Sequence, residues 1–306
     1  MNHKRENIVS ALRRAAEEKY YYAKAVRQIE QQTHADRMPL LVHTMGKVGS
    51  SSTRRSLRAS DAISGFSIYG TYFLSEEGLR FFRQLEEKGR GRWVDFPRAE
   101  KILLTEGRAL ADKIAKAAQE KSRFKVVSLV RDPVATNISA FFQKYGWWPR
   151  WLYKKCKKGE AGCVDELVKC FMRDYPHSVP LEWWDMELKT VFGVDVLATP
   201  FPKDRGYEIY RSTNADVLIM KLEKLRDCFG EAFREFMGVE NLELIDTNVA
   251  SRKWYSAAYS EFRRVIDLPQ SYLDTMYGSQ VYKNFYSLSE LDGFRQKWSQ
   301  TKEKIE

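Results

Sequence analysis

Short, continuous runs of apolar residues constrain the fold of this chain more than any other feature. The clearest are 38–44 (MPLLVHT), 124–130 (FKVVSLV) and 217–220 (VLIM), and 63–69 is a further strand candidate. Each clear run has the length of a strand that is buried on both faces, and a loop and a helical pattern follow it. Repeated strand and helix units of this kind predict an α/β fold, in which a central parallel sheet carries helices on both faces.

The rest of the chain has mainly helical patterns. We expect helices at 5–32, 54–60, 76–87, 105–120, 133–145, 164–175, 180–192 and 223–238, and several short ones between 249 and 300. Asp132 and Pro133 have the pattern of a helix N-cap followed by proline at the first helical position. We find no repeat and no low-complexity linker. The sequence therefore predicts one domain over 1–306, with an N-terminal helix in 1–36 and a helical insertion at 147–192.

Composition narrows the classes of protein. Hydrophobic residues make up 43% of 306 residues, which is enough for a core and excludes global disorder. Lysine and arginine exceed aspartate and glutamate by 51 to 41, and the net charge of +10 favours anionic partners. There is no run of eighteen apolar residues, the N-terminus is charged, and four cysteines are too few for a disulfide framework. We therefore expect a cytoplasmic protein.

The loop after the first apolar run has the composition of an anion site, since 43–52 reads HTMGKVGSSS. Between a strand and a helix, such a loop brings backbone N–H groups, hydroxyls, a lysine and the helix N-terminus to one anion. Loops that bind nucleoside triphosphates follow the pattern GxxxxGK[ST], whereas here Val48 follows Lys47 and Leu41 occupies the first glycine position. The sequence predicts a phosphate loop of another type. A plain glycine and serine turn is the alternative.

A second motif follows the run 124–130. Arg131 comes directly after it, at the carboxyl end of an expected central strand, where open α/β sheets bind their ligands. Ser139 is eight residues further on, about two helical turns, and can face the same crevice. A guanidinium and a hydroxyl that converge there suit a phosphate group. The alternative is a capped helix with Arg131 as a surface charge.

Together, KVGSSS (47–52) and RDPVATNISAF (131–141) resemble the two donor motifs of sulfotransferases that use 3′-phosphoadenosine 5′-phosphosulfate (PAPS). The segment 218–225 is similar to that family's strand ending in a Glu-x-Leu turn. The segments 183–196 and 251–262 resemble bacterial members described as putative capsular polysaccharide synthesis proteins. Over about 38–300, the resemblance implies a three-layer α/β/α sandwich of the P-loop sulfotransferase type.

The resemblance also implies roles for individual residues. Lys47 would contact the sulfuryl group, Arg131 and Ser139 would bind the 3′-phosphate, and Arg252 and Lys253 would close a basic loop over the donor. The residues that would cradle the 5′-phosphate follow Lys47 directly, namely Val48, Gly49, Ser50, Ser51 and Ser52. The family's glycine-rich C-terminal signature is absent here, so a plain surface role is the alternative for Arg252 and Lys253.

The acceptor group needs a base to take its proton. Many relatives carry a histidine or glutamate after the second strand, but 66–73 reads FSIYGTYF. Candidate bases are His177, Asp185 and Glu187, each of which has a structural alternative as a core or surface group. Tyr69 or Tyr72 would orient the acceptor, and His43 is expected in the core.

Aromatic and cysteine residues gather in the expected insertion. Trp147, Trp148, Trp151, Trp183 and Trp184 have the character of a sugar-stacking surface or, alternatively, of the core of a helical subdomain. Cys156, Cys163 and Cys170 recur every seven residues, which predicts one helical stripe and no metal site.

These observations predict a PAPS-dependent sulfotransferase that acts on a hydroxyl or amine of a carbohydrate or small natural product. It would use in-line transfer without a metal, and its partner would be that acceptor rather than nucleic acid or a membrane. The alternatives are a P-loop small-molecule kinase, a protein that binds polyanions or nucleic acid, and a family member that has lost catalysis.

Overall fold

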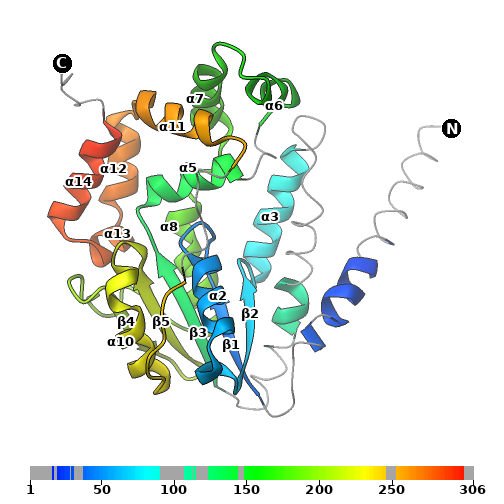
Figure 1. The fold of residues 1–306 in the computed structure, drawn as a ribbon, viewed down its shortest axis with the longest axis vertical. Helices are drawn as coiled ribbons and strands as arrows, with labels where there is room; N and C mark the ends of the chain where they lie inside the picture. Colours follow the sequence, from blue (N-terminus) through cyan, green and yellow to red (C-terminus); the bar gives the residue numbers. More distant parts are fainter. Residues whose placement is uncertain are drawn as a thin grey trace.

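The computed structural model describes residues 16, 19–27, 29–30, 37–89, 107–112, 114, 123–143, 148–245 and 253–299. These residues form an α/β fold around a sheet with the strand order β2-β1-β3-β5-β4 (Figure 1). The strands are β1 (Met38–His43), β2 (Phe66–Thr71), β3 (Phe124–Val130), β4 (Tyr207–Arg211) and β5 (Ala215–Lys221). All of the described pairs are parallel except β4 with β5, so the α/β class is confirmed, and the sheet is mostly parallel with an antiparallel edge strand.

The strand register sets where the carboxyl ends lie. β1 pairs with β2 from Met38 opposite Phe66 onward, and β3 pairs with β5 from Phe124 opposite Ala215 onward. The parallel strands therefore end at one edge of the sheet, and the loops that follow them meet there. The second strand was expected at 63–69 but begins three residues later, because the short helix η1 (Asp61–Ile63) occupies the start of that segment.

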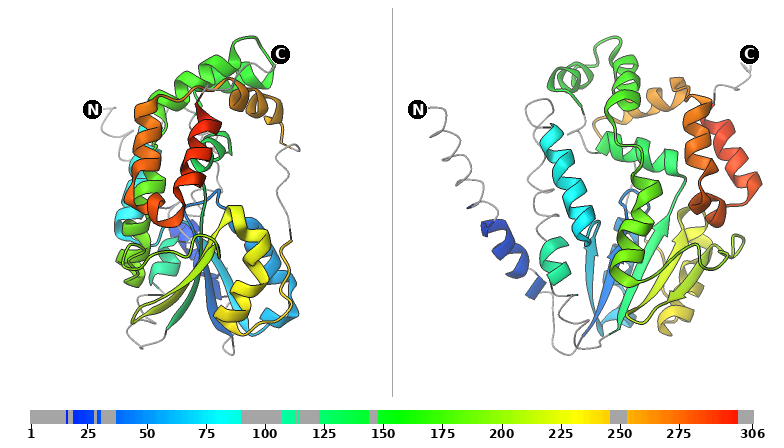
Figure 2. Two further views of the ribbon diagram at one scale, coloured as in Figure 1. Left: turned by 90° about the vertical axis from the view of Figure 1, so that its left-hand side faces the viewer. Right: turned by 180° about the vertical axis from the view of Figure 1, so that it is seen from behind.

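Helices cover both faces of the sheet (Figures 1 and 2). On one face lie α2 (Ser50–Ala59), which contacts β1 and β2, and α10 (Leu225–Met237), which contacts β4 and β5. On the other lie α3 (Glu76–Gly89) and the helical segment made of α8 (Val179–Trp183), η3 (Trp184–Lys189) and α9 (Thr190–Phe192), while α5 (Pro133–Gln143) crosses above the end of β3 and contacts α8. The middle part of this segment, η3, is a π-helix. The short helix η4 (Leu222–Lys224) joins β5 to α10.

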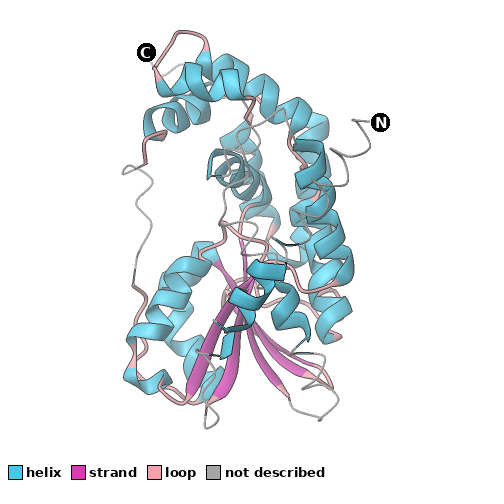
Figure 3. Cartoon of the chain, turned by 90° about the vertical axis from the view of Figure 1, so that its right-hand side faces the viewer, coloured by secondary structure: helices cyan, strands magenta, loops and turns pink. Residues whose placement is uncertain are grey.

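The remaining described helices arch over the carboxyl edge of the sheet (Figure 3). They are α6 (Arg150–Lys157), α7 (Cys163–Asp174), α11 (Ser256–Val265), α12 (Gln270–Gly278), α13 (Gln280–Phe285) and α14 (Leu288–Trp298). The expected N-terminal helix and the helix at 105–120 are helical where they are described, at 19–27 and 107–112, and otherwise lie outside the described residues. Among the described helices, none combines the length and apolar character that a membrane crossing requires.

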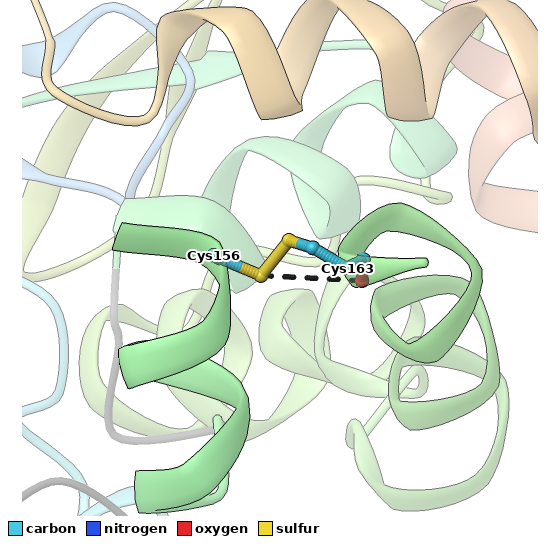
Figure 4. Close-up of a disulfide and its surroundings, with 2 residues drawn as sticks. All are labelled: Cys156 and Cys163. Carbon is cyan, nitrogen blue, oxygen red and sulfur yellow. Dashed lines mark hydrogen bonds between the residues drawn. A yellow bond between two sulfur atoms is a disulfide. The ribbon is translucent and has the colours of Figure 1, made fainter. Parts of the chain in front are cut away.

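The prediction of one cysteine stripe is wrong. Cys156 at the end of α6 and Cys163 at the start of α7 form a disulfide across the turn between these helices (Figure 4). The turn contains Gly159 and Gly162, both with positive φ, so the helix cannot continue from one cysteine to the next. The chain thus has a disulfide where its low cysteine content led us to expect none. Cys170 is a buried free thiol.

One buried carboxylate joins the central strand to the C-terminal helices. Asp132 caps α5, as predicted, by accepting hydrogen bonds from the backbone N–H groups of Val134 and Ala135 at 3.0 and 3.2 Å. It also accepts hydrogen bonds from the Tyr277 hydroxyl of α12 and the Trp298 indole of α14, both at 2.9 Å. These contacts hold the helices that arch over the site to the end of β3.

We predict that Asp132→Ala lowers the free energy of unfolding by about 3 kcal/mol, because it leaves buried donors without an acceptor. Denaturant unfolding of the two proteins measures the change. Asp292→Ala, an exposed position on α14, is the control and should leave stability unchanged. Equal stability of the Asp132 and Asp292 variants would contradict this account of the junction.

Candidate functional site

A cavity of about 320 Å³ opens at the carboxyl edge of the sheet. Its lining comes from the loop after β1, the ends of β2, β3 and β5, one face of α5, and the start of α11. The lining residues are Lys47, Gly49, Ser50, Ser51, Ser52, Tyr72, Arg131, Ser139, Phe142, Gln143, Leu222, Lys253, Tyr255 and Tyr259. The structure thus brings together most of the residues that the two motifs singled out, although the motifs are some eighty residues apart.

Two members of the predicted donor set are exceptions. The side chain of Val48 is fully buried and does not line the cavity. Arg252 lies outside the described residues, whereas its neighbour Lys253 is exposed and lines the cavity.

The loop after β1 turns sharply into α2. Gly49 has a φ of 100°, and a Cβ added there would lie 2.7 Å from a methyl carbon of Leu222, so glycine is required at this position. Lys47 also has a positive φ, of 61°. Within the described chain no side chain caps α2, which therefore begins at Ser50 with its first N–H groups beside the cavity.

Arg131 links the two motifs. Its guanidinium donates a hydrogen bond to the backbone carbonyl of Lys47 at 2.9 Å, so the loop after β1 is held to the end of β3. The next backbone N–H, that of Asp132, donates to Glu223 at 2.9 Å, and Glu223 also accepts from the Tyr286 hydroxyl at 2.8 Å. Burial raises the pKa of Glu223. These contacts join the ends of β1, β3 and β5 behind the cavity.

Helix α5 contributes one face to the cavity. Ser139, Phe142 and Gln143 are three and four residues apart and so lie on the same side of the helix. The ammonium of Lys47 contacts the side-chain oxygen of Gln143. Sequence reasoning found Ser139 but missed Phe142 and Gln143, which are one helical turn beyond it.

The charged side chains in the described lining of the cavity are all positive. Its described lining contains the cations Lys47, Arg131 and Lys253 and no aspartate or glutamate. With the N-terminus of α2 added, this arrangement favours an anionic ligand that carries more than one charge. No group of three or more metal-ligating side chains occurs among the residues that the structure describes.

The three candidate bases lie outside the cavity lining. The ring of His177 accepts a hydrogen bond at Nδ1 from the Tyr272 hydroxyl (3.0 Å) and donates one from Nε2 to the Phe171 carbonyl (2.8 Å). The neutral ring therefore has a hydrogen-bond partner at each nitrogen. Burial lowers the pKa of His177. Asp185 is exposed on η3.

The carboxylate of Glu187 is engaged in contacts inside the protein. It is fully buried 3.1 Å from Nε2 of His43, which lies in the core as expected. It accepts hydrogen bonds from the backbone N–H of Leu74 and the hydroxyl of Ser75, both at 2.8 Å. The Glu187 carboxylate therefore holds the segment that leads from β2 into α3, and Tyr72 in that segment lines the cavity.

The two tyrosines expected to orient an acceptor have different positions. Tyr72 lines the cavity, and its backbone carbonyl accepts a hydrogen bond from the Trp183 indole at 2.8 Å. Tyr69 is buried. Tyr255 and Tyr259, which sequence reasoning missed, follow the predicted Lys253 and lie one helical turn apart, but only the tertiary position of α11 brings them to the cavity.

Most of the described tryptophans belong to the core. Trp148, Trp183 and Trp184 are buried, which matches the structural alternative that the sequence left open. Trp151 is 55% exposed on α6. Trp147 lies outside the described residues.

We predict that acid destabilises the fold through His177. Because its pKa in the folded state is below the ordinary 6.5, the unfolded chain binds the proton more tightly, and stability is lost as the pH falls below about 6.5. Thermal unfolding between pH 7.5 and 5.5 measures this loss. In His177→Gln the midpoint should fall less steeply with pH, whereas equal slopes would rule out His177 as the cause.

The comparisons with known proteins give one match. A family model described as "Putative capsular polysaccharide synthesis protein" matches residues 163–287, which is less than half of the chain. The matched part includes the cavity residues Leu222, Lys253, Tyr255 and Tyr259 but not the loop after β1 or Arg131. The short name of the model, NKWYS, shares its last four letters with residues 253–256. No curated protein and no solved structure matches the chain.

Proposed function

We propose that this chain is a sulfotransferase of the P-loop type that moves a sulfuryl group from PAPS to a hydroxyl or amine of a carbohydrate. The observation that supports the proposal most is the cavity at the carboxyl edge, whose described lining joins three cations to the first turn of α2 without a carboxylate. Such a lining suits a ligand with several negative charges. The match to a model named for capsular polysaccharide synthesis supports a carbohydrate acceptor.

The cavity offers two separate sets of donors. One is Lys47 with the serines at 50–52, and the other is Arg131 with Ser139. PAPS carries anionic groups at both ends of its ribose, so two donor sets match it better than one would. The rings of Phe142, Tyr255 and Tyr259 give the cavity an aromatic side that suits a planar base.

The chemistry requires a cation at the leaving oxygen. The acceptor atom forms a bond to sulfur while the bond from sulfur to the bridging oxygen of PAPS breaks, and the acceptor proton is released to water. Negative charge grows on the bridging oxygen, and an ammonium beside it lowers the barrier. Lys47 fits this role because it lines the cavity and its ammonium contacts Gln143 there, within reach of an anionic donor.

A kinase is the alternative enzyme for a cavity of this charge. Kinase-type loops carry a serine or threonine directly after the lysine, where its hydroxyl binds Mg²⁺. In this chain that residue is Val48, whose side chain is buried. The loop therefore favours a PAPS donor over ATP.

We predict that the protein binds 3′-phosphoadenosine 5′-phosphate and does not bind ATP with Mg²⁺, as calorimetric titration would measure. Arg131→Ala should weaken binding of the bisphosphate by at least about tenfold, because a charged hydrogen bond to phosphate is lost. Arg123→Ala, which lies before the amino end of the same strand, is the matched control and should bind normally. Binding of ATP instead, or of neither nucleotide, would refute the proposal.

We also predict that Lys47→Met lowers the rate of sulfuryl transfer about 100-fold or more while the fold is kept. The rate is followed as release of 3′-phosphoadenosine 5′-phosphate from PAPS in the presence of a panel of polysaccharides. Lys169→Met removes an exposed lysine of α7 and should not change the rate. A Lys47 variant as fast as the Lys169 variant would exclude a catalytic role for this lysine.

A further inference from the structure

A row of cations runs along the exposed side of α6, above the cavity. Arg150, Lys154 and Lys157 are spaced four and three residues apart, so they lie on one face of the helix, and all three are exposed. The row is about 10 Å long at 1.5 Å per residue. We call these three residues the α6 row.

Two further lysines of α6 and the turn after it, Lys155 and Lys158, lie close to acidic residues. Lys158 lies 3.6 Å from Glu160. Lys155 lies close enough to Glu166 to lower the pKa of that carboxyl, although Lys169 has the larger effect. Lys155 and Lys158 therefore have acidic neighbours in the turn after α6 and on α7.

Aromatic rings connect the α6 row with the cavity. Trp254 is 42% exposed and stands between Lys253 and Tyr255, both of which line the cavity. Its ring packs edge-on against Tyr153 of α6, with the ring centroids 5.2 Å apart. The ammonium of Lys157 lies 5.8 Å from the centre of the same Tyr153 ring. A chain molecule that extends out of the cavity along this path meets the aromatic rings first and the α6 row next.

The opposite side of α6 packs against the rest of the protein. Leu152 is fully buried, and Cys156 is bonded to Cys163 of α7 (Figure 4). A helix that lies on a membrane needs an apolar face for the acyl chains, whereas the exposed side of α6 carries cations together with the single indole of Trp151. The disulfide also fixes α6 against α7, so the row is presented on a rigid support.

We propose that the α6 row and Trp254 bind an anionic polysaccharide, whose carboxylates pair with the cations while a sugar ring stacks on the indole. This inference rests on the proposed function, and it specifies the acceptor as a negatively charged glycan chain that extends from the cavity over α6. Nucleic acid and anionic membranes share the charge and are separated by the experiment.

The test measures binding of polygalacturonate to the whole protein, with dextran as the neutral polysaccharide, single-stranded DNA and phosphatidylserine vesicles beside it. We expect polygalacturonate to bind and dextran not to bind at the same concentration. The double variant Lys154→Gln/Lys157→Gln should weaken binding about tenfold or more and flatten its dependence on salt. Trp254→Ala should weaken binding at high salt as well, because stacking is not screened.

Lys189→Gln/Lys283→Gln is the matched control, since it removes the same charge from exposed positions on other helices. Control and test variants that bind polygalacturonate equally would overturn the proposal, as would tighter binding of DNA or vesicles than of polygalacturonate. Binding of 3′-phosphoadenosine 5′-phosphate is measured on the same samples and should be unchanged by the α6 substitutions. If polygalacturonate binds as expected and the nucleotide does not bind at all, the donor assignment fails while the glycan surface stands.

Discussion

The buried carboxylate of Asp132 is the contact on which the arrangement of the site depends. It follows Arg131 directly, and its oxygens accept hydrogen bonds from the first turn of α5, from Tyr277 and from Trp298. One side chain thereby fixes where β3 ends, where α5 starts and where the C-terminal helices lie. Because Arg131 and the α5 face both line the cavity, their relative position follows from this junction.

Acidic and basic side chains occupy different positions around the site. Asp132 and Glu187 are buried behind the walls, and these two carboxylates and that of Glu223 hold backbone N–H groups or hydroxyls of the segments that form those walls. The side chains that face the cavity include cations and, among the described lining, no carboxylate. The carboxylates thus hold the loops that form the cavity walls, while the cations of the lining face a ligand in the cavity.

Local pattern was sufficient for the central strands and for the two motifs. β1, β3 and β5 are short apolar runs because both of their faces are covered, and the lysine loop and Arg131 follow two of them directly. The parallel register then brings both motifs to one edge of the sheet. β4 was missed because YEIYR is a short edge strand without a continuous apolar run, and its place depends on antiparallel pairing with β5.

Other features depend on tertiary contacts. Asp185 and Glu187 are two residues apart and so lie on opposite sides of their helix, but only the packing of that helix decides that Glu187 is the buried one. The disulfide depends on two glycines that reverse the chain between α6 and α7. Tyr255 and Tyr259 reach the cavity because α11 crosses above it, a placement that no local pattern encodes.

A crystal structure of the protein grown with 3′-phosphoadenosine 5′-phosphate tests the central claim most directly. The account predicts the 3′-phosphate beside Arg131 and Ser139 and the 5′-phosphate at the first turn of α2, with Lys47 released from Gln143 toward the 5′ end. A nucleotide bound elsewhere on the molecule, or one whose phosphates contact neither Arg131 nor the loop after β1, would contradict it.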